Sequence, residues 1–154
     1  QYYWIATERL HELDNYDYSV QGSCDGENMI GGEYIPAYSE FEKENIGKAF
    51  KLIHSDDTNT ASGSGLVSQA PSYGESDFYC LKNAGISVIV DPVTLAGKFD
   101  QSVAGLEDLK VKDADNVIIK QLDERGLLCS SKREMHSYHF CWRTGNQLIY
   151  KAIP

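Results

Sequence analysis

Apolar residues recur at helical spacing along one stretch of the chain, residues 113–125. Three of them fall on a single helical face: Val117, Ile118 and Leu122. Asp113 stands at the front, where a carboxylate can accept the unpaired backbone N–H groups of a first turn. Gly126 follows the last turn, where glycine commonly stops a helix. The pattern therefore predicts a helix that Asp113 caps and Gly126 ends.

Two shorter helices are predicted from the same rules. One covers residues 77–84, with Ser76 as its cap and Gly85 as its stop. A weaker candidate covers residues 8–13 behind Thr7.

Clusters of β-branched and aromatic residues between turn residues predict four strands, over residues 50–54, 65–68, 86–90 and 147–153. The pairs Gly31-Gly32 and Asp91-Pro92 are typical of turns. Short strands with helices inserted between them favour an α+β class over a regular βαβ series.

Composition is that of one ordinary globular domain. The chain has 154 residues, 42% hydrophobic and 24% charged, and a chain of this size is expected to bury roughly 68–70% of its unfolded surface. The cysteines are scattered, which predicts reduced thiols rather than a disulfide framework: Cys24, Cys80, Cys129 and Cys141. No run approaches 18 apolar residues and the first residues do not resemble a signal peptide, so we expect a cytoplasmic location and no membrane partner.

The formal net charge of −9 argues against a free-standing DNA or RNA binder, because such proteins cluster Lys and Arg against phosphates. The local basic pairs, Lys110 with Lys112 and Lys132 with Arg133, are interpreted as solvated surface. Any nucleic acid is therefore expected to be delivered by another part of a larger protein.

Generic catalytic patterns are weak in this chain. The run around Ser64 lacks the leading glycine of a G-x-S-x-G nucleophile elbow and the third glycine of a dinucleotide loop. Four residues have the chemistry of zinc ligands, but their spacing matches no standard finger or ribbon: Cys129, His136, His139 and Cys141. Structural roles for these side chains are favoured, and no metal site is predicted.

One loop is chemically suggestive. A glycine-rich stretch, residues 63–68, leads into residues 69–74 and then into the shorter helix, which places Asp77 in its first turn. Backbone N–H groups and the helix dipole attract a carboxylate there, and a fixed carboxylate is a good anchor for an ammonium group. The alternative is that Asp77 only stabilises the helix start, and the pattern alone leaves both open.

Three runs of residues, in order, resemble the editing domain of isoleucyl-tRNA synthetases. Residues 62–78 read SGSGLVSQAPSYGESDF and are similar to that domain's G-T-G-x-V-H-x-A-P-x-F-G-E-D-D-Y. Residues 111–115 and 124–128 read VKDAD and ERGLL, which match a helix of the family and its end. Residues 136–143 and 148–152 read HSYHFCWR and LIYKA and are similar to H-S-Y-P-F-C-W-R and P-L-I-Y-R-A. The resemblance covers nearly the whole chain and is closest to the eukaryotic-type cytosolic form.

The resemblance implies an α+β fold with an antiparallel β-barrel-like core and inserted helices, residues 1–154 forming a single editing-domain fragment. The family's threonine-rich strand and its catalytic Rossmann domain are not in the sequence, so we expect the isolated fragment to be inactive. The implied partners are the CCA end of tRNA(Ile) carrying valine and the remainder of the synthetase in cis. No cofactor is expected here, because ATP and magnesium belong to the parent's synthetic domain.

In the isoleucyl-tRNA synthetase family, which is the usual worked example of this problem, editing compensates for weak selection by size: one methylene lets the synthetic site prefer isoleucine over valine by only roughly 150-fold. The resemblance implies that Asp77 holds the α-ammonium of the wrong amino acid while water attacks the ester. It also implies that backbone near the terminal adenosine comes from Gly65 and from the loop through Pro71 and Gly74.

Ser68 departs from the family pattern, since it stands where a histidine near the tRNA end is usual. Serine supplies no titratable imidazole. One alternative is therefore a degenerate module that binds tRNA ends or a partner without hydrolysis. Another is the editing domain of the related valyl or leucyl enzyme, which the HSYHFCWR run disfavours.

Overall fold

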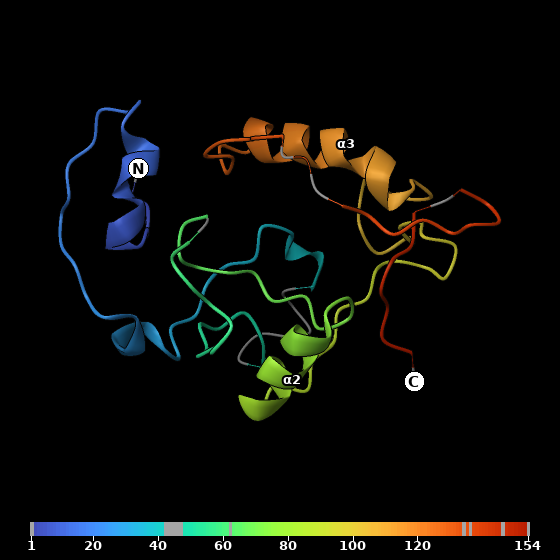
Figure 1. The fold of residues 1–154 in the computed structure, drawn as a ribbon, viewed down its shortest axis with the longest axis horizontal. Coiled ribbons are helices and arrows are strands. Elements are labelled where there is room, and N and C mark those ends of the chain that lie inside the picture. The colour runs from blue at the N-terminus through green and yellow to red at the C-terminus, as the bar shows by residue number, and fades with distance from the viewer. Residues whose placement is uncertain are drawn as a thin grey trace.

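The computed structural model describes residues 2–41, 48–61, 63–133, 135, 137–145 and 147–153. Its elements, in chain order, are the 3₁₀ helices η1 (Thr7–Leu13), η2 (Gly26–Met29) and η3 (Ser39–Phe41) and the α-helices α2 (Glu75–Asn83) and α3 (Val111–Glu124). Figure 1 shows α2 and α3 on opposite sides of the molecule, with irregular chain between them.

The α3 helix ends as predicted but begins earlier. Its N-cap is Lys110, so Asp113 lies in the first turn and does not cap it, and no side chain bonds to the helix start. Gly126 adopts a φ of 66°, and the Leu127 N–H donates to the Leu122 carbonyl at 2.8 Å. This bond satisfies a carbonyl that the last turn leaves unpaired.

The α2 helix likewise ends where predicted but begins earlier than predicted. Its N-cap is Gly74, so Ser76 lies inside the first turn and is not the predicted cap. Gly85 follows the end with a φ of 72°, and the Ile86 N–H donates to the Leu81 carbonyl at 2.9 Å. The predicted stop is confirmed.

The weak N-terminal helix also forms, as the 3₁₀ helix η1. It begins at Thr7 behind Ala6, with Glu8 in its first turn. The prediction of a helix here is confirmed, although its backbone is the tighter 3₁₀ form.

The four predicted strands do not form in the described residues. Within the part of the chain that the structure describes, pairing occurs only at isolated bridges: Glu33 with Lys51, Val93 with Phe99, Lys98 with Lys110, and Phe140 with Gln147. Two of these bridges touch predicted strands, 50–54 and 147–153, while 65–68 and 86–90 have none. A strand needs a neighbour along its edge, which β propensity does not specify. The α+β class with a barrel-like core stays a prediction.

One predicted turn forms and the other is displaced. Gly31 adopts a φ of 84°, and the Gly31 and Gly32 region pairs with Leu52 through two bonds of 2.8 Å. No turn occurs at Asp91-Pro92. The chain instead turns at Gly97, whose φ is 71° and whose N–H donates to the Thr94 carbonyl at 2.9 Å.

The buried core is small. Val103, Leu106 and Ala114 form its centre, and partly buried side chains from three regions surround them: Tyr38, Phe41, Phe99, Leu109, Val117 and Ile118. Two of the three apolar residues predicted for one face of α3 therefore pack inward. Gly105 lies beside α3 with a φ of 80°, which favours glycine, and a Cβ there would lie 2.8 Å from the side-chain Nε2 of Gln121.

The molecule exposes far more surface than its mass predicts. Its accessible surface is 12132 Å², whereas a folded monomer of 17.2 kDa exposes roughly 7,800 Å². The chain thus buries about half of its unfolded surface, and the expected 68–70% is wrong for it. Separated helices and isolated bridges leave large apolar side chains uncovered, among them Trp4, Ile35, Leu95, Trp142 and Tyr150. None of the described helices has the length and hydropathy needed to cross a bilayer.

Candidate functional site

The loop of residues 69–74 is closed by hydrogen bonds that converge on Ala70. The Tyr73 and Gly74 N–H groups both donate to the Ala70 carbonyl, at 2.9 and 3.0 Å. The Ala70 N–H in turn donates to Oδ2 of Asp77 at 2.9 Å. Asp77 therefore faces the loop from the first turn of α2, and one of its oxygens fastens the loop to the helix.

Gly74 makes room for that carboxylate. A Cβ on Gly74 would lie 2.6 Å from Oδ2 of Asp77 and 2.9 Å from its Cγ, closer than real contacts allow. The φ of Gly74 is −129°, which any residue adopts. Space, and not backbone conformation, therefore favours glycine here, because a larger residue would displace the Asp77 side chain.

The other predicted site residues are only partly gathered. Pro71 lines a cavity of about 310 Å³ together with Phe78 of α2. Ser68 is exposed. Gly65 lies against the N-terminal segment, since a Cβ there would be 2.5 Å from the Cβ of Ala6. The structure thus brings Asp77, Gly74 and the loop together and gives Gly65 a packing role.

Arg9 of η1 holds the glycine-rich stretch in place. Its guanidinium donates to the Gly63 carbonyl at 3.1 Å and to the Ala61 carbonyl at 3.2 Å. The Ala6 N–H donates to the Ser64 carbonyl at 2.7 Å. We call these contacts of Ala6 and Arg9 the N-terminal strap. Nothing in the sequence pattern marked Arg9, because its partners are backbone carbonyls more than 50 positions away.

A second set of bonds holds the loop from its other side. The Tyr73 hydroxyl donates to the Asp91 carboxylate at 2.9 Å, and Lys151 donates to the same oxygen at 2.7 Å. Burial, followed by the hydrogen bond to Asp91, raises the pKa of Tyr73 well above its ordinary value of 10.0. Partial burial acts to raise the pKa of Asp91, but the bonds from Lys151 and Tyr73 outweigh it and bring that pKa below 3.8. Neither Asp91, which the pattern indicated only as part of a turn, nor Lys151 was predicted as a site residue, although the basic position of the P-L-I-Y-R-A motif could have indicated Lys151.

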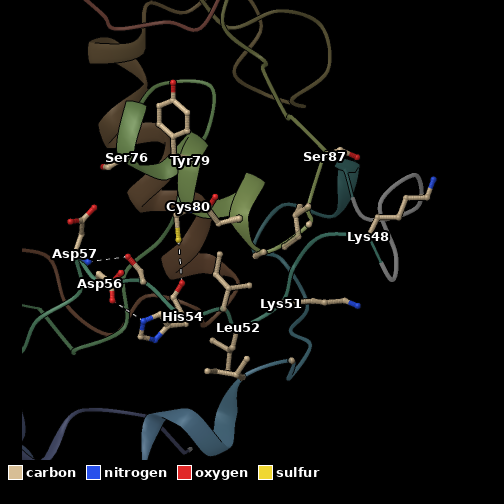
Figure 2. Close-up of a pocket in the computed structure, with 18 residues that line it drawn as sticks. Lys48, Lys51, Leu52, His54, Asp56, Asp57, Ser76, Tyr79, Cys80 and Ser87 are labelled. Atoms are coloured by element: carbon tan, nitrogen blue, oxygen red, sulfur yellow. Dashed lines mark hydrogen bonds and ion pairs between the residues drawn. The ribbon is translucent and has the colours of Figure 1, made fainter.

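A larger cavity, of about 1000 Å³, lies on a different face of α2. Ser76, Tyr79 and Cys80 line it, and Asp77 does not. Figure 2 shows Cys80 directed at His54, whose carbonyl accepts its thiol hydrogen bond at 3.3 Å. Its size would favour this cavity as the site, but the residues of the motif at positions 62–78 lie around the loop of residues 69–74 instead.

No group of three metal-ligating side chains occurs among the described residues. Of the residues weighed for zinc, His136 lies outside that part of the chain. His139 contacts the ring of Tyr150 edge-on at 6.4 Å. Hydrogen bonds from Thr144 lower the pKa of the Cys141 thiol.

Comparison with known proteins places the sequence in a family. The chain is 36% identical to "Isoleucine--tRNA ligase, cytoplasmic" of Saccharomyces cerevisiae over 99% of its length, and 37% identical to the enzyme of the same name from Caenorhabditis elegans, also over 99%. It is 35% identical to "Isoleucine--tRNA ligase" of Protochlamydia amoebophila over 98%. The chain belongs to the isoleucyl-tRNA synthetase family.

The isoleucyl-tRNA synthetase relatives are much longer than this chain, which spans 15%, 14% and 15% of their lengths in the same order. They include cytoplasmic eukaryotic and bacterial enzymes, with similar identities. No protein-family model matches the chain.

Proposed function

We propose that this chain is the editing segment of an isoleucyl-tRNA synthetase and that, within the complete enzyme, it hydrolyses valine wrongly esterified to tRNA(Ile). The observation that carries the proposal is the Asp77 carboxylate, which the loop bond from Ala70 and the space at Gly74 fix at the start of α2. Asp77 is also the residue that aligns with the ammonium-binding aspartate of the family motif.

Asp77 is suited to hold the α-ammonium of the aminoacyl group. Among the described residues, its hydrogen bond to Ala70 engages Oδ2, and Oδ1 makes no hydrogen bond. The Asp77 side chain is partly exposed, so an ammonium can reach it from solvent. A charge-assisted bond of this kind is roughly twice as strong as a neutral one.

The hydrolysis itself requires no protein nucleophile. A water oxygen attacks the ester carbonyl carbon, the bond from that carbon to the ribose oxygen breaks, and the ribose oxygen takes the proton that the water gives up. Valine and deacylated tRNA are the products. The protein contributes by positioning the ester and by stabilising charge that develops on the carbonyl oxygen.

The proposal includes the rest of a synthetase in cis, because the net charge of −9 makes this segment a poor RNA binder alone. That remainder would deliver the CCA end of tRNA(Ile) and carry the ATP-dependent ligation. The predicted β-barrel-like editing fold is part of the same proposal.

A module that binds the tRNA end without hydrolysis is the second candidate. Ser68 favours it, since this exposed serine replaces the usual histidine. The loop and Asp77 would then retain an aminoacyl end without promoting attack by water.

The two candidates are separated by measuring the deacylation of Val-tRNA(Ile) and Ile-tRNA(Ile) by the native-length protein, by which we mean the proposed synthetase that carries this segment. Editing predicts faster hydrolysis of the valyl ester, and Ser68→His is expected to raise that rate or leave it unchanged. Binding of Val-tRNA(Ile) with no hydrolysis above the uncatalysed rate would support the second candidate.

A further inference from the structure

A polar cluster joins three distant segments beside the proposed site. Oδ1 of Asp91 accepts the Tyr73 hydroxyl at 2.9 Å and the Lys151 ammonium at 2.7 Å. Lys151 also donates to the Val93 carbonyl. The side chains of Lys151 and Asp91 are only 17% and 33% exposed, so solvent screens this pair less than an ordinary surface pair. We call Tyr73, Asp91 and Lys151 the Asp91 clamp.

Backbone bonds reinforce the clamp at the neighbouring residue. Ser72 is 1% exposed, and its hydroxyl donates to the Val90 carbonyl at 2.6 Å. The Ala152 N–H donates to the Ser72 carbonyl at 2.7 Å. Residues 72–73 are thus held by the segment around Asp91 on one side and by the C-terminal segment on the other.

Hydrogen bonds through Ala70 connect the clamp to Asp77, the residue proposed to bind the substrate. Tyr73 and Gly74 both donate to the Ala70 carbonyl, and Ala70 donates to Asp77. A displacement of residues 72–73 therefore moves the donor that fixes the Asp77 carboxylate. Displacements of about 1 Å at such positions can cost on the order of a hundredfold in rate.

We propose that Asp91 and Lys151 are positioning residues, which hold the loop of residues 69–74 so that Asp77 meets the aminoacyl group in working geometry. This inference rests on the proposed editing function. Lys151 acts through Asp91 and Tyr73 and does not touch the substrate. Because the matching family motif carries arginine at this position, Lys151→Arg is the conservative variant.

The test uses the native-length protein with Lys151→Met, Lys151→Arg and, as a matched control, Lys120→Met. Lys120 forms an exposed ion pair with Glu124 on α3, away from the loop. We expect Lys151→Met to lower kcat for Val-tRNA(Ile) hydrolysis roughly tenfold with KM changed less than about twofold, because positioning is lost while tRNA binding elsewhere persists. Lys151→Arg should restore kcat, and Lys120→Met should leave it unchanged.

Hydrogen exchange of the amides in residues 69–74 gives a second readout that needs no activity. Lys151→Met should speed exchange in this loop, whereas Lys120→Met should not. Unchanged exchange with unchanged kcat would overturn the clamp, as would an equal loss of kcat in the arginine variant. If the unmodified protein does not hydrolyse Val-tRNA(Ile), the proposed function fails, and the exchange measurement still decides the clamp.

Discussion

At the scale of single residues, the site depends on the absence of a side chain at Gly74, which leaves room for the Asp77 carboxylate. The Asp77 carboxylate occupies the position that a side chain on Gly74 would fill, and the Ala70 N–H fixes it there. The sequence predicted Asp77 in the first turn of a helix from its place behind the loop. It could not predict Ala70 as its partner, because any residue but proline offers the same backbone N–H group.

Gly74→Ala is predicted to impair editing. The added Cβ would push Asp77 away and weaken its bond to Ala70, with a cost of about 1–3 kcal/mol for overpacking. We expect deacylation of Val-tRNA(Ile) to fall roughly tenfold. Gly26→Ala is the matched control, since a Cβ at Gly26 meets nothing within 4 Å. Equal rates for the two variants would contradict this role of Gly74.

At the scale of elements, the helix ends could be predicted from glycine residues, whereas the helix starts could not be predicted. Gly85 and Gly126 end α2 and α3 because both adopt positive φ, a conformation that glycine tolerates best. Both helices begin without a side-chain cap, so the caps predicted at Ser76 and Asp113 lie two and three residues too late. Strand pairing depends on neighbours distant in sequence, which local residue type does not reveal.

The N-terminal strap gives a prediction at this scale. Gly65→Ala should loosen η1 from the glycine-rich stretch, because the new Cβ would lie 2.5 Å from Ala6. Gly63→Ala isolates that clash, since Gly63 also has a positive φ but would meet nothing within 4 Å. Limited proteolysis should cut near residues 2–13 faster in Gly65→Ala than in Gly63→Ala. The same cleavage rate in both would mean that backbone strain alone matters.

The Asp91 clamp should depend on pH in a defined direction. A carboxyl whose pKa is lowered by folding stabilises the structure above its ordinary pKa of 3.8 and loses that effect as the pH falls through the lowered value. Loop amides 69–74 should therefore exchange more slowly in the unmodified protein than in Asp91→Asn at about pH 6. The difference, corrected for intrinsic exchange rates, should disappear in strong acid. A difference that is independent of pH would contradict the charged clamp.

At the scale of the whole molecule, the segment has a small buried core and a large exposed apolar surface. Its surface of 12132 Å² and its small core show that many of its large apolar side chains find no cover within the described chain. Composition could not predict this, because 42% hydrophobic residues are compatible with a full core. The proposed remainder of a synthetase in cis is one partner that would cover such surface.

The most direct test of the account is the rate of Val-tRNA(Ile) deacylation by native-length protein carrying Asp77→Asn, measured beside Asp113→Asn. Asparagine can still accept the Ala70 N–H but cannot neutralise an ammonium group. Asp113 is the matched control, because it occupies the same first-turn position of α3. The account predicts a loss of roughly a hundredfold for Asp77→Asn and no loss for Asp113→Asn. Hydrolysis by Asp77→Asn at the unmodified rate would contradict it.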